Sequence, residues 1–502
     1  MSSKVLDKST RDENEKENDS NIRVFHSLQK NKIFLQKKFN HSTDVTFYEL
    51  ESPVGIKALV VFIDGIVNKE LLYRDVINPL IIKSNDIKPN NDFEAFKTIF
   101  PVTNMKEMND FKQIITDILD GNTIIFVDEV KYAISISCRE WEKRAITEPN
   151  SETIIRGPKE GFIESIHINR SLIRRKIKNP NLVFETMEIG KQTKTVINIS
   201  YVEGIVSKDV LAEVRRRLSK IDTDSILDAG YIEEFIEDSH ISPISTVGNT
   251  QKPDIVAAKI LEGRVAILCD GSPHVLTVPH LFTEAMQTSE DYYIRPYAAS
   301  SLRIIRYVAL MISILFPAFY VALETFHQEM LPTLLLITMV GANKGTPFPA
   351  FLEALLMITA FEFLKESGTR LPKAVGSAIS IVGALVLGDA AVKAGVVSAD
   401  LVIVVAFTAV SSFIIPSLNE MISIYRLILL ALAGLMGLYG ITAGVFLMLF
   451  HASSIRSFGV PYMSPLAPAN LEGLKDAAVR LPIWSMKRRP SFISKRNKTR
   501  RK

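Results

Sequence analysis

Long apolar stretches are confined to the second half of this chain, whereas residues 1–303 mix short apolar runs with charged segments. Four stretches carry almost no charge, and they cover residues 304–323, 374–392, 401–418 and 427–450. Since an α-helix rises about 1.5 Å per residue, roughly 20 residues cross the ~30 Å hydrocarbon core of a bilayer. The pattern therefore predicts a large soluble head followed by an α-helical polytopic membrane domain.

The head contains two stretches of similar design. Residues 57–80 and 196–218 each begin with a β-branched apolar run, continue with an acidic residue and a glycine, and end in an amphipathic stretch. Each pattern predicts a strand, a tight turn and a helix. We interpret Asp64-Gly65 and Glu203-Gly204 as turn residues, because no glycine-rich loop with a Lys-Ser/Thr partner indicates phosphate binding.

A second pair of similar stretches covers residues 122–137 and 264–279, and each predicts a β-hairpin with an acidic turn. The glycines of the two strand–helix stretches are 139 positions apart, and the acidic turns of the two hairpins are 142 apart. Such similar offsets in independent elements predict a two-lobed α/β head, made of duplicated strand–helix/hairpin subdomains.

Composition and charge set the outer limits of these regions. Residues 1–20 are polar and charged without apolar periodicity, which is typical of a disordered tail, and the C-terminal end is strongly basic. We expect five regions, namely a disordered charged tail (1–30), a first α/β subdomain (31–145), a second α/β subdomain (146–295), a transmembrane domain (296–455) and a C-terminal segment with a basic tail (456–502).

The chain carries no pattern typical of an enzyme or of a cofactor site. Its two cysteines, Cys138 and Cys269, lack a CxxC spacing, and we interpret them as free buried thiols. The histidines are scattered among different elements, and neither a GxSxG nor an HExxH motif occurs. We therefore expect no enzyme activity, no catalytic residues, no metal and no cofactor.

A basic cluster lies on a predicted helix at residues 170–178. These side chains could contact anionic lipid headgroups or an acidic face of a neighbouring subunit, and a solvated helix face is the alternative. Because no aromatic residues interleave with these charges, we expect no binding of nucleic acid.

The topology of the membrane domain follows from its flanking charges. Arg303 and Arg306 lie at the start of the first apolar stretch, and the basic tail follows the last one. By the positive-inside rule both ends face the cytoplasm, so an even number of crossings is expected. The head has no signal peptide and is expected on the same side. Residues 330–364 form an apolar element broken by GANKGTPFP at 341–349, which leaves four or six crossings open.

Two acidic residues, Glu353 and Glu362, lie in this broken element and are the intramembrane acidic candidates. Ionisable residues at membrane depth are costly and commonly functional. The two residues are nine positions apart, which places them about 180° apart on a helix, so they cannot line one narrow face together. A role in ion passage and a role as caps or interfacial residues are both open.

The segment 374–392 alternates small with β-branched residues, which permits close approach of helices. A spacing of three or four residues selects one face, and the pore-lining or gate candidates on it are Val375, Ile379, Val382, Val386 and Asp389. In a ring of identical helices, such a face makes an apolar constriction that gates by dewetting. Ordinary helix packing is the alternative, and for Asp389 the alternative is a helix-end ion pair with Lys393. The glycines of the last stretch are interpreted as a packing seam, at Gly434, Gly437, Gly440 and Gly444.

Eight long runs of this sequence share the pattern of one protein family. They are RGPKEGF (156–162), LIRRKIKNPNL (172–182), ILDAGYIEE (226–234), VAAKILEGRVAILCDGSP (256–273), EDYYIRPYAASSLRIIRY (290–307), PFPAFLEALLM (347–357), ESGTRLPKAVGSAISIVGALVLGDAAVKAGVVSADLVIVVAFTAVSSFIIP (366–416) and SIRSFGVPYMSPLAP (454–468). Together they resemble the A subunit of GerA-type spore germinant receptors. The resemblance covers about residues 44–468, and the two tails lie outside it.

The resemblance implies a nutrient receptor in the inner membrane of a spore, which triggers germination. It implies two partners, a transporter-like B subunit that binds the nutrient and a C-subunit lipoprotein. It also implies that the A subunit self-associates into a ring among membrane lipids, and that the helices of this ring form a nutrient-gated ion channel. The α/β head would then assemble or gate the ring.

Two other functions are open at this point. The first is direct binding of the germinant in the cleft between the two lobes of the head. The second is a structural scaffold that only docks the B and C subunits. Ion conduction by the purified subunit would separate a channel from a scaffold, and titration of the head with ligand would test direct binding.

Overall fold

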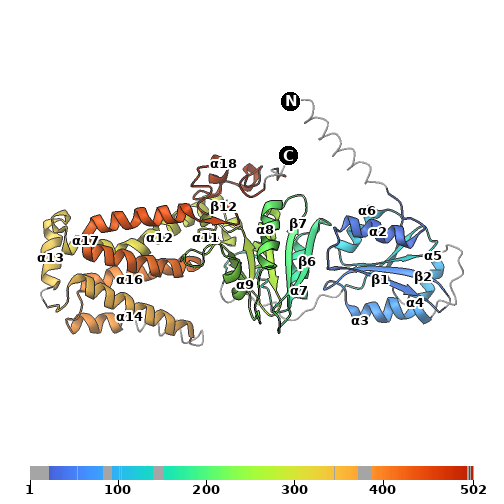
Figure 1. Ribbon diagram of the computed structural model, residues 1–502, viewed down its shortest axis with the longest axis horizontal. Helices are drawn as coiled ribbons and strands as arrows, with labels where there is room; N and C mark the ends of the chain where they lie inside the picture. Colours follow the sequence, from blue (N-terminus) through green and yellow to red (C-terminus); the bar gives the residue numbers. More distant parts are fainter. Residues whose placement is uncertain are drawn as a thin grey trace, which may run out of the picture. The chain divides into compact units, whose positions relative to one another are not determined.

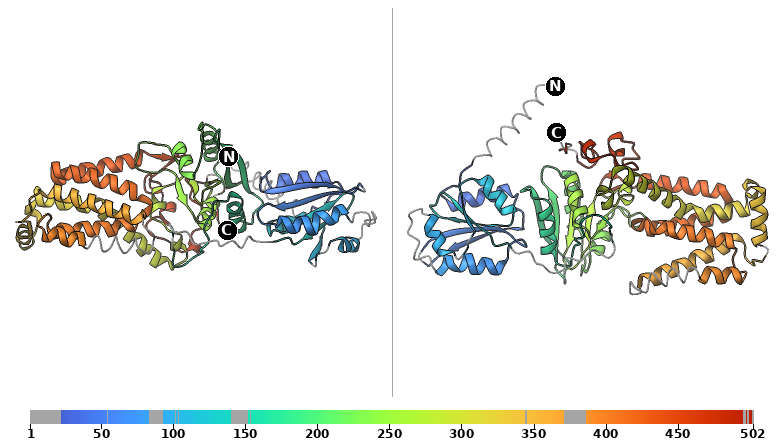
Figure 2. Two further views of the ribbon diagram at one scale, coloured as in Figure 1. Left: turned by 90° about the horizontal axis from the view of Figure 1, so that it is seen from below. Right: turned by 180° about the vertical axis from the view of Figure 1, so that it is seen from behind.

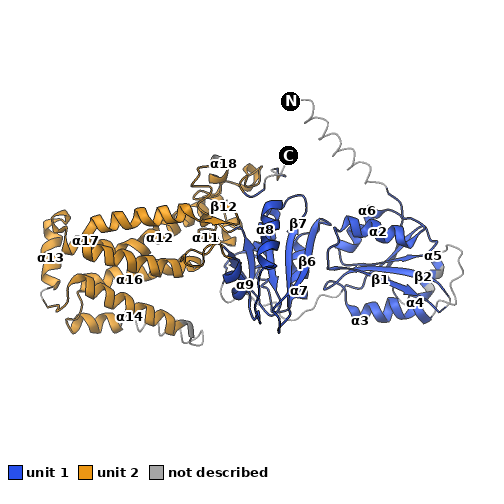
Figure 3. Cartoon of the chain, in the orientation of Figure 1, with its two compact units in different colours: residues 1–236, 247–279, 493–499 blue, residues 237–246, 280–492, 500–502 orange. Residues whose placement is uncertain are grey.

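The computed structural model describes residues 22–53, 55–82, 93–100, 102, 104–139, 152, 154–343, 345–370, 386–494, 497 and 499–500 (Figure 1). The chain divides into two compact units, which are residues 1–236, 247–279 and 493–499, and residues 237–246, 280–492 and 500–502 (Figure 3). The first unit is mixed α/β and the second is mainly helical. Within the α/β unit we call residues 22–139 lobe 1, and residues 154–236 with 247–279 lobe 2.

Each lobe is built around a five-stranded sheet whose neighbouring strands are all antiparallel. The strand order is β1-β2-β4-β5-β3 in lobe 1 and β6-β7-β9-β10-β8 in lobe 2, so the two sheets share one topology. The strands are β1 (Val45–Glu51), β2 (Lys57–Ile63), β3 (Met105–Met108), β4 (Thr123–Val127), β5 (Ala133–Ile136), β6 (Leu182–Ile189), β7 (Thr195–Val202), β8 (Gly248–Thr250), β9 (Val265–Cys269) and β10 (Val275–Val278).

The predicted strand–helix stretches and hairpins are present in both lobes. β2 turns through Gly65 towards its helix and β7 turns through Gly204, and these glycines have φ of 87° and 85°. A positive φ strains a side chain but not glycine, which explains the residue type at both turns. The hairpins are β4–β5 and β9–β10. The sequence patterns did not indicate the first strand of each sheet, β1 or β6.

Helices cover both faces of each sheet (Figures 1 and 2). In lobe 1, Val60 and Ile125 contribute to the core on one face, whereas Leu59 and Ile124 contribute to the core on the other. Successive strand residues point to opposite faces, so central strands covered on both sides are continuously apolar. The covering segments are α2 (Leu28–Lys38), α3 (Lys69–Leu72), η2 (Tyr73–Ile77), α4 (Asn78–Ile82), α5 (Phe93–Ile99), α6 (Phe111–Leu119), α7 (Ile166–Lys176), α8 (Lys208–Leu218), α9 (Ala229–Ile236) and α10 (Pro253–Glu262).

The helical unit begins with two short helices and a long one. Its elements are α11 (Phe282–Ala285), η4 (Ser289–Tyr292), α12 (Pro296–Thr325), η5 (Gln328–Met330), α13 (Thr333–Asn343), α14 (Ala350–Arg370), α16 (Ala399–Phe413), η6 (Pro416–Leu418), α17 (Asn419–Ser454), β11 (Arg456–Ser457), β12 (Val460–Pro461), α18 (Leu471–Leu474) and η7 (Ile483–Ser485). The break between α13 and α14 confirms the predicted interruption of the apolar element at residues 341–349.

α17 is a helical hairpin and not one straight helix (Figures 1 and 2). Tyr425 Oη lies 2.7 Å from His451 Nδ1, although the two residues are 26 positions apart, a spacing that covers about 39 Å in a single helix. The chain reverses at Gly437, whose φ of 59° and ψ of −140° are not helical. The prediction of one continuous span over residues 427–450 is therefore wrong, because Gly437 adopts a conformation that ends the helix.

Glycines allow the two arms of the α17 hairpin to approach each other. A Cβ atom on Gly440 would clash with the backbone of Leu432 in the opposite arm, and one on Gly444 would clash with the side chain of Leu429. The seam role is therefore confirmed for Gly440 and Gly444, whereas Gly437 forms the reversal and Gly434 faces Phe351 of α14.

Two segments of the described residues, Pro296–Thr325 and Pro416–Ser454, are long and apolar enough to cross a membrane. The second of them contains the hairpin, so it supplies two antiparallel arms of about 26 Å each. Shorter apolar helices, α13 and α16, accompany them. Most of the predicted span at residues 374–392 lies outside the described residues.

Candidate functional site

The gate candidates lie on the segment of which the structure describes only the C-terminal part. Val375, Ile379 and Val382 are outside the described residues. Val386 is exposed, and Asp389 is exposed and accepts a hydrogen bond of 2.7 Å from Lys393 Nζ. The structure therefore brings Asp389 together with Lys393, four residues later, in the arrangement that their spacing favours.

Glu362 belongs to an ion pair that connects three helices of the bundle. Arg426 is 1% exposed, and its Nη1 donates to Glu362 Oε1 over 3.2 Å. Its Nε donates over 2.8 Å to the backbone oxygen of Ser313 in α12. Pro317 lies four residues after Ser313 and has no N–H, so this carbonyl lacks its normal helical partner. Arg426 thus supplies the hydrogen bond that Pro317 removes.

Glu353 lies in the first turn of α14 and is separate from Glu362. It is 3% exposed, and its Oε2 accepts a hydrogen bond of 3.1 Å from the backbone N–H of Ser398. Ser398 is the N-cap residue of α16, so Glu353 ties the starts of two helices together. Negative charge is favoured at helix N-termini, which accounts for part of its stability there.

A polar cluster that the sequence patterns did not indicate surrounds Tyr320 near the C-terminal end of α12. Tyr320 Oη lies 3.2 Å from Ser398 Oγ and donates to Asp400 Oδ2 over 3.1 Å. One turn further along α12, Glu324 accepts a hydrogen bond from Asn343 Nδ2 at the end of α13. The sequence does place these polar residues at the edges of apolar stretches, and this position could have indicated the cluster. We interpreted none of them as a site.

The arginines at the start of α12 are paired with acidic side chains. Asp291 is fully buried and accepts hydrogen bonds of 2.8 Å from both Arg303 Nε and Arg306 Nη1. Arg303 Nη1 also donates to Asp476 Oδ1 over 2.8 Å. Burial alone would raise the pKa of Asp291, but the hydrogen bonds and charges of the two arginines outweigh it and lower the pKa below 3.8. Arg303 therefore fastens the C-terminal segment to α12, and both arginines hold Asp291.

The two lobes of the head are joined by a buried ion pair. Arg174 of α7 is fully buried, and its Nε and Nη2 donate to the two carboxylate oxygens of Asp44 over 2.8 Å each. The neighbouring Ser42 donates to Asp44 and accepts from the backbone N–H of Phe184 in β6. Backbone pairing continues this contact, since the N–H of Thr43 donates to the oxygen of Phe184 over 3.0 Å.

A second contact between the lobes involves the turn after β2. Asp64 pairs with Lys69 of its own lobe at 2.9 Å and with Arg170 of α7 at 3.3 Å. Burial alone would raise the pKa of Asp64, but Lys69, Arg170 and His167 outweigh it and lower the pKa. A Cβ atom on Gly65 would lie 3.0 Å from the backbone oxygen of His167, so this turn has room only for glycine.

These contacts revise the interpretation of the basic cluster at residues 170–178. Arg170 and Arg174 are buried against acidic residues of lobe 1, so they neither form a solvated face nor remain available for lipid. Lys178 is exposed and pairs with Asp120 of lobe 1 at 2.6 Å. Arg175 and Lys176 pair with Glu160 of lobe 2. The acidic partners of this cluster thus lie in both lobes of the same chain.

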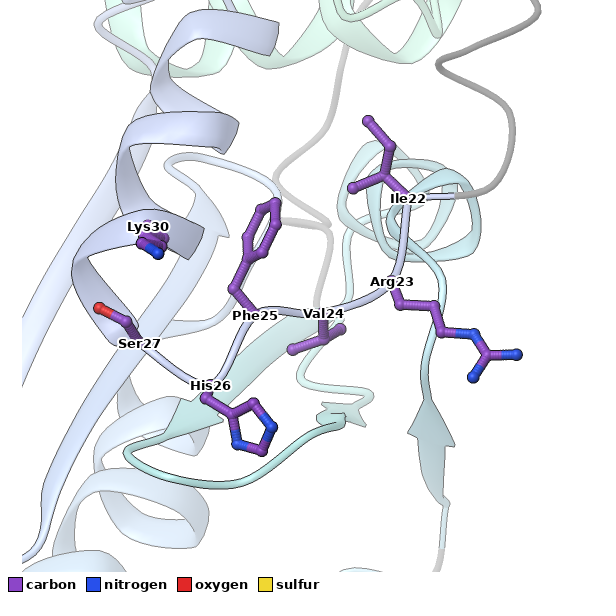
Figure 4. A pocket seen from close by; sticks show the side chains of 7 residues that line it. All are labelled: Ile22, Arg23, Val24, Phe25, His26, Ser27 and Lys30. Atoms are coloured by element: carbon purple, nitrogen blue, oxygen red, sulfur yellow. The ribbon is translucent and has the colours of Figure 1, made fainter.

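Two surface hollows occur in the α/β unit, and each lies within one lobe. The larger, about 560 Å³, is lined by a single segment, residues 22–27 with Lys30 (Figure 4). The side chains of that segment point in different directions around the turn before α2 (Figure 4). The smaller, about 400 Å³, is lined by residues 187–191 and 218–223. Neither hollow combines residues of both lobes.

The part of the chain that the structure describes holds no group of three His, Cys, Asp or Glu side chains arranged to bind a metal ion together. Cys138 and Cys269 are free and buried, as we interpreted them. Burial raises the pKa of Cys138 to about 11 and that of Cys269 to about 12. Both thiols are therefore protonated at neutral pH.

The mixed α/β unit is combined with a helical unit that has two segments long and apolar enough to cross a membrane, which suggests a membrane-associated protein. The chain belongs to the family described as Bacillus/Clostridium GerA spore germination protein, which matches residues 34–492. This match confirms the resemblance to the A subunits of spore germinant receptors.

Relatives of known sequence extend over nearly the whole chain. Spore germination protein KA of Bacillus subtilis (strain 168) is 43% identical over 492 residues, which cover 97% of this chain and 90% of that protein. The membrane protein YfkQ of the same organism is 38% identical over 457 residues, 91% of this chain and 89% of that protein. A crystal structure of the N-terminal domain of the A subunit of the Bacillus megaterium spore germinant receptor GerK3 matches with a TM-score of 0.42 and 31% identity, covering 52% of this chain and 98% of that one.

Proposed function

We propose that this chain is the membrane subunit of a spore germinant receptor that triggers germination in response to nutrients, by oligomerising into a nutrient-gated ion channel. Family membership supports the receptor role. The role in the membrane is supported by the positions of polar and apolar side chains in the helical unit, which are the reverse of those in a water-soluble protein. In this unit the pairs Arg426–Glu362 and Arg303–Asp291 each contain a fully buried arginine, while many of the large apolar side chains are exposed.

The exposed apolar side chains lie on several helices of the unit. Leu334 and Ile337 of α13 are 81% and 65% exposed, Ile403 of α16 is 67% exposed, and Phe446 of α17 is 73% exposed. Contiguous apolar surface of this kind marks contact with lipid or with another protein chain. We propose that lipid tails and neighbouring copies in a ring cover these faces.

The helical unit supports an even number of crossings of the spore inner membrane. At its start, Ser300 of α12 accepts a hydrogen bond from the backbone of Arg480. At its end, the strands after α17 reach back to the same region, where the N–H of Phe282 donates to the oxygen of Tyr462. Both ends of the bundle therefore lie at one end of the unit. We propose a multi-pass protein whose head and C-terminal tail face the cytoplasmic, or core, side.

The five-region division given above and the duplication of the head are part of this proposal, and the shared strand order of the two sheets supports the duplication. As partners we propose a transporter-like B subunit, a C-subunit lipoprotein, further copies of this chain and membrane lipids, without nucleic acid. We propose no enzyme activity.

For the gate we propose the apolar face of residues 374–392, which comprises Val375, Ile379, Val382 and Val386 and ends at Asp389. Val382 is in the middle of that segment, where apolar bulk excludes water and holds the pore shut. Val382→Ala removes roughly 1–2 kcal/mol of apolar burial per subunit, and a ring multiplies the effect. Glu353 and Glu362 stay candidates for ion passage only through their effect on the bundle, since both are engaged in interhelical hydrogen bonds.

Spores that carry Val382→Ala test the proposed gate. We expect them to germinate without nutrient at a normal receptor level, because the constriction becomes wet. The matched control is Val410→Ala, which removes the same atoms from a side chain of α16 that is 65% exposed, and which should leave germination dependent on nutrient. Slow germination with a reduced receptor level would show that Val382 packs in a core, and normal nutrient dependence would remove it from the mechanism.

Direct germinant binding by the head and a purely structural scaffold remain the alternative proposals. The buried pair of Arg174 and Asp44 occupies the contact between the lobes, so a ligand there would have to displace a bidentate hydrogen bond. Saturable binding of nutrient to the purified chain without its partners would favour the head as the receptor site. A chain that assembles with its partners but conducts no ions would favour the scaffold.

A further inference from the structure

In the helical unit, Glu324 lies close enough to two other acidic side chains, Glu353 and Asp400, to interact with each of them electrostatically. They come from the C-terminal end of α12, the first turn of α14 and the first turn of α16. No described lysine, arginine or histidine forms an ion pair with any of the three. The cluster therefore concentrates negative charge where burial makes unpaired charge costly.

Buried oxygen atoms without a hydrogen-bond donor are a second, independent feature of this cluster. Glu324 Oε2, Asp400 Oδ1 and Asn343 Oδ1 are each buried and accept no hydrogen bond within the part of the chain that the structure describes. Buried acceptors without a donor are rare in folded proteins, and each is expected to have a partner of some kind. All three are acceptors, so the missing partner is a donor or a cation.

Glu324 and Asp400 are half-buried, whereas Glu353 is enclosed. Its side chain is 3% exposed, and the hydrogen bond that its carboxylate receives comes from the uncharged N–H of Ser398. The N-terminus of α16 offsets part of the charge of Asp400, because Asp400 lies in the first turn of that helix. Glu324 lies near the opposite, C-terminal end of α12, where the helix dipole disfavours a negative charge.

The donor set indicates the chemical class of the missing partner. Carboxylate and amide oxygens with a neighbouring tyrosine hydroxyl are hard ligands, and the cluster offers neither sulfur nor imidazole. Calcium accepts six to eight oxygen ligands in irregular geometry, whereas magnesium requires a near-ideal octahedron. Two carboxylates with one amide oxygen fit such a site, and Glu353 adds negative potential behind it.

We propose that Glu324, Asn343 and Asp400 form a binding site for a hard, calcium-like cation that holds the ends of α12 and α13 against the start of α16. The site is complete within one chain and does not depend on the proposed pore. A bound cation would supply the partner that the three buried oxygens lack, and would offset the mutual repulsion of the carboxylates.

Thermal unfolding of the purified full chain in detergent tests this site, with chelator and then with increasing calcium. We expect saturable stabilisation by calcium, because a ligand that binds only the folded state raises its stability. Glu324→Gln and Asp400→Asn should each weaken the apparent affinity for calcium at least tenfold. The matched control is Glu472→Gln, which changes an exposed carboxylate of the same unit that is already paired with Arg488 and which should bind calcium as the wild type does.

The comparison without calcium separates a cation site from a merely structural role. In chelator, Glu324→Gln and Asp400→Asn should unfold at a higher temperature than the wild type, because each removes an unbalanced charge. The order should reverse at saturating calcium. Two results would overturn the proposal, namely the absence of saturable stabilisation of the wild type by calcium, or equal loss of affinity in Glu472→Gln. Stabilisation by acid without any response to calcium would also overturn it, because the carboxyl groups would then share a proton.

Magnesium and potassium identify the class of ion in the same assay. A response to calcium that neither ion reproduces at equal concentration supports the calcium-like class, whereas stronger stabilisation by either ion contradicts it. Failure of the channel proposal would leave these results unaffected, since the assay involves neither nutrient nor ion flux.

Discussion

Arg426 is expected to compensate for Pro317, and a double-mutant cycle can measure this compensation. Pro317 removes the N–H that would bond the oxygen of Ser313, and Arg426 Nε donates to that oxygen over 2.8 Å. In Arg426→Met the oxygen loses this donor, and Glu362 loses its charged partner on α17 but keeps the hydrogen bond from Ser423. Adding Pro317→Ala returns a backbone N–H to the same oxygen, so the two substitutions should be coupled.

The magnitude follows from the burial of each group. An unsatisfied buried carbonyl costs about 1–3 kcal/mol. Loss of one partner of a fully buried ion pair costs about 3–5 kcal/mol. The cost of leaving Glu362 without Arg426 is smaller, because the Glu362 side chain is 33% exposed and Lys365 lies 3.6 Å from it. We therefore expect Arg426→Met to lower the free energy of unfolding by about 2–4 kcal/mol. Pro317→Ala should recover about 0.5–2 kcal/mol more in the Arg426→Met background than in the wild type.

Reversible unfolding of the full chain in mixed detergent micelles, titrated with SDS, gives the four free energies of the cycle. Lys393→Met is the matched control, because Lys393 is an exposed cation of the same unit, and it should change stability by at most about 0.5 kcal/mol. Additive effects of Pro317→Ala and Arg426→Met, within about 0.3 kcal/mol, would refute the compensation.

Three further predictions concern groups outside the apolar helices. Burial raises the pKa of Cys138 to about 11 and that of Cys269 to about 12. Both thiols should therefore resist thiol reagents at about pH 8 in the folded chain and react after unfolding. Labelling of the folded chain would contradict their burial. Arg174→Met should lower the free energy of unfolding of the head by about 3–5 kcal/mol, measured in urea by amide exchange of the two sheets. The control Lys191→Met changes an exposed lysine and should lower it by about 0.5 kcal/mol or less. Equal losses of stability in the two variants would count against the interlobe pair. Because the pKa of Asp291 is lowered in the fold, its ionised side chain stabilises the fold above pH 3.8, and this stabilisation is lost as the pH falls below that value. Asp291→Asn should therefore flatten the acid limb of a plot of unfolding free energy against pH. An unchanged acid limb would exclude this role.

Local patterns predicted much of the head. The β-branched runs, the turn glycines and the similar offsets indicated two strand–helix stretches and two hairpins, and the sheets contain them in equivalent positions. The first strand of each sheet was missed, because β1 and β6 are only partly buried and mix polar with apolar residues. The pairing of Arg174 with Asp44 could not be predicted, since it joins residues 130 positions apart without any shared pattern.

The helical unit was less predictable, because its decisive features are single residues. Hydropathy alone cannot distinguish a long helix from a hairpin, and the reversal of α17 depends on the conformation of Gly437. Arg426 was overlooked because it stands just before the apolar stretch at 427–450, and its partner Ser313 lies in a different helix. The cluster around Glu324 combines polar residues from four segments, each of which is unremarkable in its own stretch.

Ion release from liposomes is the most direct test of the central claim, that this chain forms a gated ion channel. The purified chain would be reconstituted into vesicles loaded with potassium, as the wild type, as Val382→Ala and as the Val410→Ala control, with equal protein incorporated in each. We expect the wild type and Val410→Ala to retain potassium until an ionophore is added, while Val382→Ala releases it without nutrient. Retention of potassium by folded, oligomeric Val382→Ala would contradict the account.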